Sequence, residues 1–130
     1  MLPVQTINEY GRENAMRNTF AALCVVAMVA ALFIGGAQPV AVGSVSAPWD
    51  KLAHALFFFV FVMLLRLSFT VPLWLMAGAA VVVGAVDELH QLFLPGRTPG
   101  LDDWLADVVG VVLAVMIIRL VSPSLTTELT

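Results

Sequence analysis

Residues 88–110, ELHQLFLPGRTPGLDDWLADVVG, connect two long apolar segments through a short run rich in proline and glycine. Both residue types favour turns, so this run predicts a tight connection between two helices. The same stretch concentrates polar side chains in a chain that is 61% hydrophobic and only 12% charged. Ionisable groups at or inside a bilayer boundary are costly, and their concentration here indicates a functional site.

The composition of the whole chain indicates a membrane protein. Soluble domains are usually about 45–50% apolar, well below the value found here. A spanning helix needs about 20 mostly apolar residues, because its backbone must satisfy its own hydrogen bonds across a hydrocarbon core about 30 Å thick. The 130 residues have room for four such helices. The sequence therefore predicts an all-α fold, an integral membrane four-helix transmembrane bundle.

The apolar segments and the glycine and proline residues between them predict the boundaries. One four-span membrane domain is expected over residues 19–121, with spans at about 19–35, 50–69, 71–94 and 101–121. Residues 1–18 are predicted to form a cytoplasmic N-terminal tail and residues 122–130 a C-terminal tail. A cleaved signal peptide is the alternative for the first apolar run, because Arg12 and Arg17 precede it. The further spans and the length of the run favour its retention.

Net charge and cysteine content exclude some functions. The net charge is −3, and no basic cluster is present, so the sequence predicts no nucleic-acid binding. Cys24 is the single cysteine, which rules out an internal disulfide and a cysteine metal cluster.

Basic residues near the span ends predict the orientation. A cytoplasmic N-terminus places Arg12, Arg17, Arg66 and Arg119 inside, and leaves only Lys51 and Arg97 outside. Both termini are then cytoplasmic. The start of the second span, the end of the third and the start of the fourth meet at the outer face.

Acidic residues dominate this predicted outer face. It brings together two basic residues, two histidines and six acidic residues: Lys51, Arg97, His54, His90, Asp50, Asp87, Glu88, Asp102, Asp103 and Asp107. With both histidines neutral the formal charge is −4. Protonation, ion pairing or a bound divalent cation must offset part of this charge.

Helical periodicity sorts these residues by face. Three pairs share a face at a spacing of three or four residues: Asp50 with His54, Glu88 with Gln91, and Asp103 with Asp107. Gly84 and Gly110 lie on two of these faces and permit close helix approach. We expect Asp87 and Asp102 to face the rim, and His90 to point away from the face of Glu88.

Three sequence blocks carry a family resemblance. D-K-x-x-H at 50–54, E-x-x-Q-x-F-x-P-x-R at 88–97 and D-x-x-x-D-x-x-G at 103–110 resemble the VanZ-like family of small bacterial membrane proteins, with the match extending to about residue 117. The family's motif positions fall on Asp50, Lys51, His54, Glu88, Gln91, Arg97, Asp103 and Gly110. One departure is Asp107, where the family usually has Asn.

The resemblance implies a multi-pass protein of the bacterial inner (cytoplasmic) membrane. The family takes its name from a protein that gives low-level resistance to the glycopeptide antibiotic teicoplanin. Our first hypothesis is an envelope protein that contacts membrane lipids, binds a lipid-linked precursor or a lipoglycopeptide, and alters glycopeptide susceptibility. The expected binding residues are Asp50, Lys51, His54, Glu88, Gln91, Arg97, Asp103 and Asp107.

Two further hypotheses remain open. One is an intramembrane metal-assisted hydrolase or transferase acting on a lipid headgroup, with His54, Glu88, Asp103 and Asp107 as candidate ligands. Its catalytic candidates are Glu88, His54 and Asp103, with Arg97 holding a phosphate or carboxylate. The other is a proton-linked transporter, which would require a homo-oligomer. The alternative to all three is a purely structural cluster, although interhelical hydrogen bonds average only about 0.6 kcal/mol.

Overall fold

The computed structural model describes residues 4–41, 43 and 45–122, and in these ranges the chain is helical, with no strand. The four long helices are α1 (Val4–Ala30), α2 (Trp49–Ser68), α3 (Leu73–Gln91) and α4 (Leu101–Val121). Each of them, α1 from Ile7 onward, lies in a segment long and apolar enough to cross a membrane. The prediction of an all-α, multi-pass membrane protein is confirmed.

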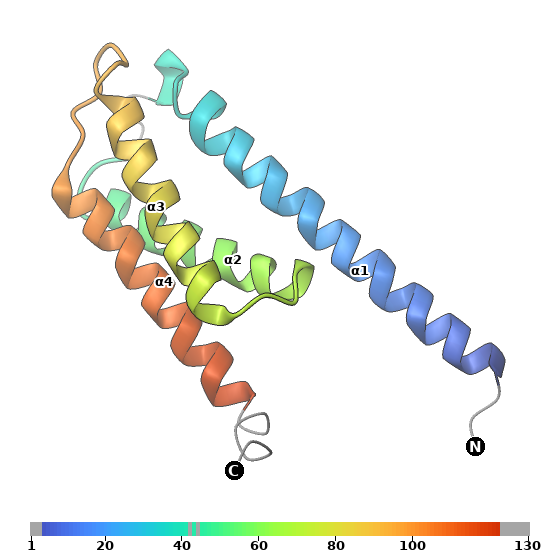
Figure 1. Cartoon of the computed structure of the whole chain (residues 1–130). Coiled ribbons are helices and arrows are strands. Elements are labelled where there is room, and N and C mark those ends of the chain that lie inside the picture. Colours follow the sequence, from blue (N-terminus) through green and yellow to red (C-terminus); the bar gives the residue numbers. More distant parts are fainter. Residues whose placement is uncertain (1–3, 42, 44, 123–130) are drawn as a thin grey trace.

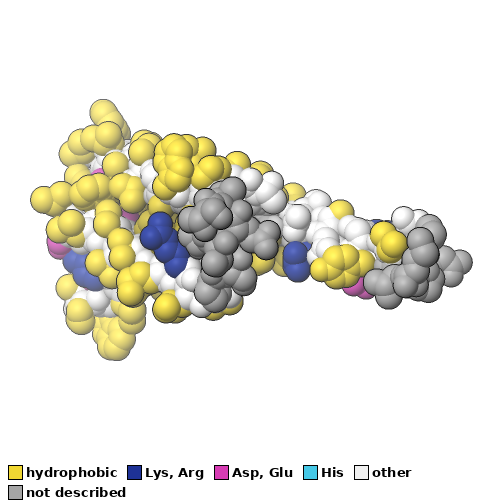
Figure 2. All heavy atoms as spheres, turned by 60° about the horizontal axis from the view of Figure 1, so that its bottom comes forward, with side chains coloured by type: hydrophobic (Ala, Val, Ile, Leu, Met, Phe, Trp, Pro, Cys, Tyr) yellow, Lys and Arg dark blue, Asp and Glu magenta, His cyan; other side chains and the backbone are white. Residues whose placement is uncertain are grey.

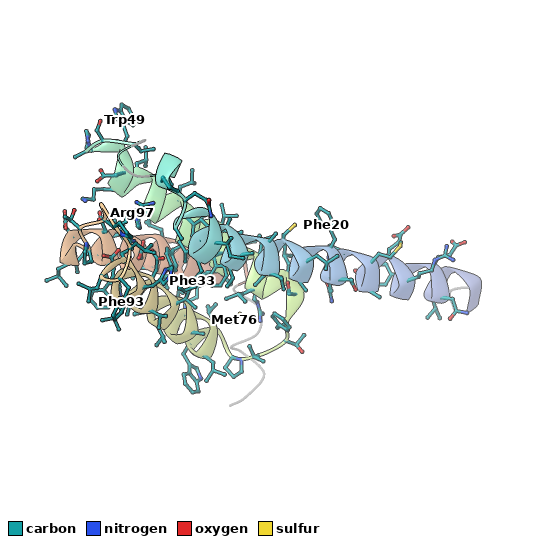
Figure 3. All side chains as sticks on the ribbon, turned by 90° about the horizontal axis from the view of Figure 1, so that it is seen from above. Phe20, Phe33, Trp49, Met76, Phe93 and Arg97 are labelled. Atoms are coloured by element: carbon teal, nitrogen blue, oxygen red, sulfur yellow. The ribbon has the colours of Figure 1, made fainter. Side chains whose placement is uncertain are left out.

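Helix α1 extends further toward the N-terminus than the expected first span. It begins at Val4 and continues into a π-helical turn, η1 (Ala31–Gly35). Its N-terminal half projects away from the other helices (Figures 1 and 3). Residues 4–18 are thus one helix with the apolar run that follows, and the tail boundary at residue 18 remains a prediction.

The turns between helices follow from proline and glycine. Pro72 directly precedes α3, where its fixed φ suits a helix start. Helix α3 ends at Gln91, and the connection to α4 includes Gly96 with φ of +79°. This left-handed conformation is readily available only to glycine. Gly100 lies in extended conformation immediately before α4.

The core lies between α2, α3 and α4, where α2 packs most extensively against α4. Its buried residues come from all three helices: Phe58, Phe61, Val62, Ala80, Val111, Ala114 and Ile118. Small residues bring α2 and α4 together, because the backbone at Gly110 lies against the carbonyl oxygen of Ala55. This contact agrees with the small-residue face predicted for the fourth span.

The helices alternate in direction. The η1 end of α1, the start of α2, the end of α3 and the start of α4 therefore lie at one end of the bundle (Figure 1). We call this the polar end. At the opposite end Arg66 and Arg119 line a shallow hollow. Figure 2 turns that end forward and shows basic side chains with hydrophobic ones beside them.

Candidate functional site

Lys51 joins the first turns of α2 and α4. Its Nζ lies 3.0 Å from Asp50 Oδ2 and 2.8 Å from Asp102 Oδ2, and it also contacts Asp103 Oδ1. Asp102 is largely exposed, as expected for a rim residue. Asp103 is thereby paired with a lysine, so of the four candidate metal ligands it is the one that already has a cation.

His54 and Asp107 form a second polar contact between α2 and α4, deeper in the bundle. His54 Nδ1 lies 2.8 Å from Asp107 Oδ1. The Asp107 side chain is fully buried, and its Oδ2 has no hydrogen-bond partner. It fits beside α3 because position 84 is glycine: a Cβ on Gly84 would lie 2.7 Å from Oδ2.

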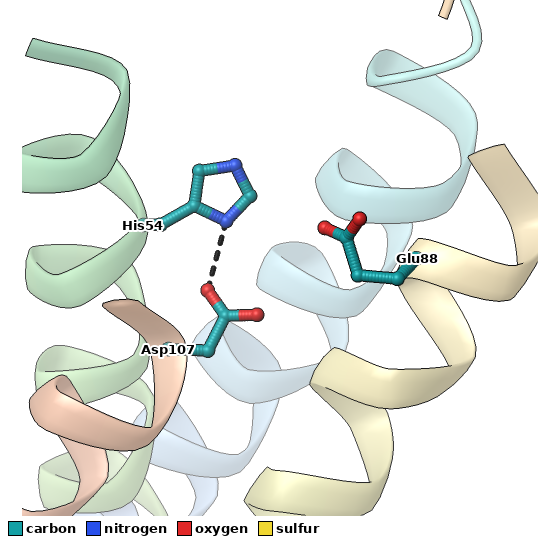
Figure 4. Close-up of side chains that lie close together, drawn as sticks. All are labelled: His54, Glu88 and Asp107. Atoms are coloured by element: carbon teal, nitrogen blue, oxygen red, sulfur yellow. Dashed lines mark hydrogen bonds and ion pairs between the residues drawn. The ribbon is translucent and has the colours of Figure 1, made fainter. Parts of the chain in front are cut away.

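Glu88 of α3 faces the His54–Asp107 pair (Figure 4). One potential ligand atom from each of His54, Glu88 and Asp107 lies within 4.8 Å of the other two. The backbone N–H of Gly100 donates a hydrogen bond of 2.8 Å to Glu88 Oε2 and fixes that carboxylate. The structure thus brings three of the four candidate metal ligands together.

Asp87 departs from the expectation that it faces the rim, since its side chain is buried. Gln91 Nε2 donates a hydrogen bond of 2.9 Å to Asp87 Oδ2. The spacing offers a reason, because Asp87 comes four residues before Gln91 and three after Gly84, on the face that packs inward. The sequence therefore carries a signal for the buried position of Asp87.

His90 lies against η1. Its ring centroid is 5.5 Å from that of Phe33. The expectation that His90 points away from the face of Glu88 agrees with this contact.

Arg97 differs from Lys51 in its partners. Its Nη2 donates a hydrogen bond of 2.8 Å to the carbonyl oxygen of Gly36. Within the described ranges no carboxylate lies within 4.0 Å of its guanidinium group, and its Nε is buried without a partner. Nothing in the sequence predicts this hydrogen bond between Arg97 and the backbone at the end of η1.

Two cavities have Arg97 in their walls. The first, about 310 Å³, lies between η1, α2 and α3 and includes His54, Asp87, Gln91 and Arg97 in its wall. The second, about 280 Å³, lies toward the loops and includes Asp50, His54, Gln91, Arg97 and Asp103. Arg97, His54 and Gln91 therefore line both, whereas Glu88 and Asp107 line neither.

The fold and site define a class: a helical, multi-pass membrane protein with a polar site at one end of its bundle. The VanZ/LLP1 family model matches residues 1–122, and the chain belongs to this family. A comparison with curated proteins and one with solved structures each found no match. The resemblance drawn from three sequence blocks is confirmed over nearly the whole chain.

Proposed function

We propose that this protein binds the anionic headgroup of an amphiphile at the outer face of the bacterial inner membrane. The expected ligands are a lipid-linked envelope precursor or a lipoglycopeptide, and binding would alter susceptibility to teicoplanin-type antibiotics. Arg97 is the observation that carries this proposal, because it lines both cavities and has no carboxylate partner among the described residues.

The guanidinium group of Arg97 suits this role. Arginine stays charged and binds phosphate or carboxylate through paired N–H donors. Among the described residues, Arg97 makes one hydrogen bond, from Nη2 to the Gly36 carbonyl oxygen. Its remaining Nη donors would bind a headgroup in the cavities.

Acidic neighbours would oppose an anion, but the structure reduces this effect. Lys51 is shared by three carboxylates. Asp87 lines the larger of the two cavities, and its Oδ2 accepts a hydrogen bond from the Gln91 side-chain amide. These contacts support a headgroup site close to Arg97.

The basic residues support the orientation of this site. Arg66 and Arg119 lie at the end opposite Arg97, and Arg12 and Arg17 lie in the projecting half of α1. With these four residues on the cytoplasmic side, both termini are cytoplasmic and the polar end faces outward.

A second candidate function is metal-assisted hydrolysis or group transfer on the bound headgroup. His54 favours it, because its ring belongs to the wall of both cavities and also contacts Asp107. Of the three candidate catalytic residues, His54 lines both cavities, Asp103 lines one and Glu88 lines neither, so His54 is the candidate that would face the headgroup. The proton-linked transporter and the homo-oligomer remain predictions.

Binding of a polyprenyl phosphate and of teicoplanin to the detergent-purified protein tests the proposal. We expect Arg97→Gln to weaken binding by about tenfold or more, since hydrogen bonds to charged groups contribute about 1.5–3 kcal/mol. Arg97→Lys should recover only part of the affinity. Arg119→Gln, at the opposite end, is the matched control and should bind as the wild type does. Equal affinities of the wild type and Arg97→Gln for both probes would contradict the proposal.

A further inference from the structure

We infer that His54, Glu88 and Asp107 form a binding site for one divalent transition-metal ion of the zinc type. The three side chains come from α2, α3 and α4, so the ion would hold three helices together at the polar end (Figure 4). The inference concerns metal binding alone and does not depend on the proposed headgroup ligand.

The distances suit such a site. One atom of each side chain lies within 4.8 Å of the other two. Zinc–ligand bonds are about 2.0–2.2 Å and zinc sites are tetrahedral, so two ligand atoms on one ion lie about 3.4 Å apart. The ligand atoms must therefore approach one another by at most about 1.4 Å to hold one ion.

The environment of Asp107 Oδ2 also favours a bound cation. The carboxylate is fully buried and this oxygen has no hydrogen-bond partner. A buried polar atom without a partner costs about 1–3 kcal/mol, and more when it is charged. Because Oδ1 already contacts His54, Oδ2 is the oxygen left for a cation.

The charges of the three side chains also favour a bound cation. Glu88 and Asp107 carry two negative charges when ionised, and His54 is the only basic group in their cluster. Lys51 is held by Asp50, Asp102 and Asp103, while Arg97 is bonded to a backbone carbonyl oxygen. Buried carboxylates need a compensating charge, which a divalent ion supplies.

The donor set indicates the class of metal. An imidazole favours zinc and similar transition metals over magnesium or calcium, which prefer oxygen ligands alone. Three protein ligands leave a further position for water, as in catalytic zinc sites. The Gly100 N–H on Glu88 Oε2 is the kind of outer contact that orients a metal-binding carboxylate.

The test uses the full chain, purified in detergent and stripped with a chelator, then titrated with Zn²⁺ alone against a competing chelator. We expect about one ion per chain and a higher thermal midpoint with Zn²⁺. Asp107→Asn and Glu88→Gln should each lower the Zn²⁺ affinity by tenfold or more, whereas the control Asp103→Asn should retain it, because Asp103 belongs to the Lys51 cluster.

Two results would overturn the inference. One is a wild type that binds no Zn²⁺, which needs no variant to fold. The other is Glu88→Gln or Asp107→Asn binding Zn²⁺ as tightly as the wild type. Arg97→Gln separates this test from the proposed function, because it should lose the polyprenyl phosphate and keep the metal.

Discussion

Gly110 of α4 lies directly against the carbonyl oxygen of Ala55 in α2, with no space for a Cβ atom between them. Overfilling a packed contact usually costs about 1–3 kcal/mol, so we expect Gly110→Ala to lower the free energy of unfolding by that amount. Denaturant titration in detergent micelles measures the change. Gly78→Ala is the control, since a Cβ there meets nothing within 4 Å, and this variant should be neutral or slightly more stable. Equal losses in the two variants would contradict the close contact.

Lys51→Met should destabilise the polar end, because it leaves Asp50, Asp102 and Asp103 to repel one another without their shared cation. We expect a lower thermal midpoint, with a smaller deficit at high salt, where charge repulsion is screened. Adding Asp103→Asn to the variant should recover part of the loss. Arg119→Met, which removes a cation that has no ion pair among the described residues, provides the comparison. A double variant no more stable than Lys51→Met would argue against a shared charge cluster.

The proposed outward orientation of the polar end predicts which cysteines react in intact cells. In a Cys24→Ser background, Thr98→Cys and Glu13→Cys each introduce one thiol at an exposed position. A membrane-impermeant maleimide should label position 98 in intact cells, and position 13 only after permeabilisation. The reverse pattern would place the polar end in the cytoplasm.

The fold followed from local sequence features. Apolar segments of spanning length, separated by Pro72, Gly96 and Gly100, predicted α2, α3 and α4. Alternating direction then placed the polar residues of these helices at one end. Composition and turn chemistry are sufficient for this result, because a hydrocarbon core admits few backbone structures.

The pairing within the site could not be predicted in the same way. Spacing along one helix shows which side chains share a face, and on that basis Asp87 should have been placed inside with Gln91. Spacing does not show which carboxylates meet Lys51, or that Arg97 bonds to a carbonyl oxygen of Gly36. Those contacts depend on the rotation and depth of neighbouring helices, which packing sets.

Because Asp107 packs against Gly84, the residues allowed at positions 84 and 107 depend on each other. A side chain gained at position 84 would overlap the carboxylate, so such a change is tolerated only after the residue at 107 has become smaller. We expect the two positions to vary together among members of the family, with the loss of volume at 107 coming first. Lineages that keep an acidic residue at 107 should also keep glycine at 84.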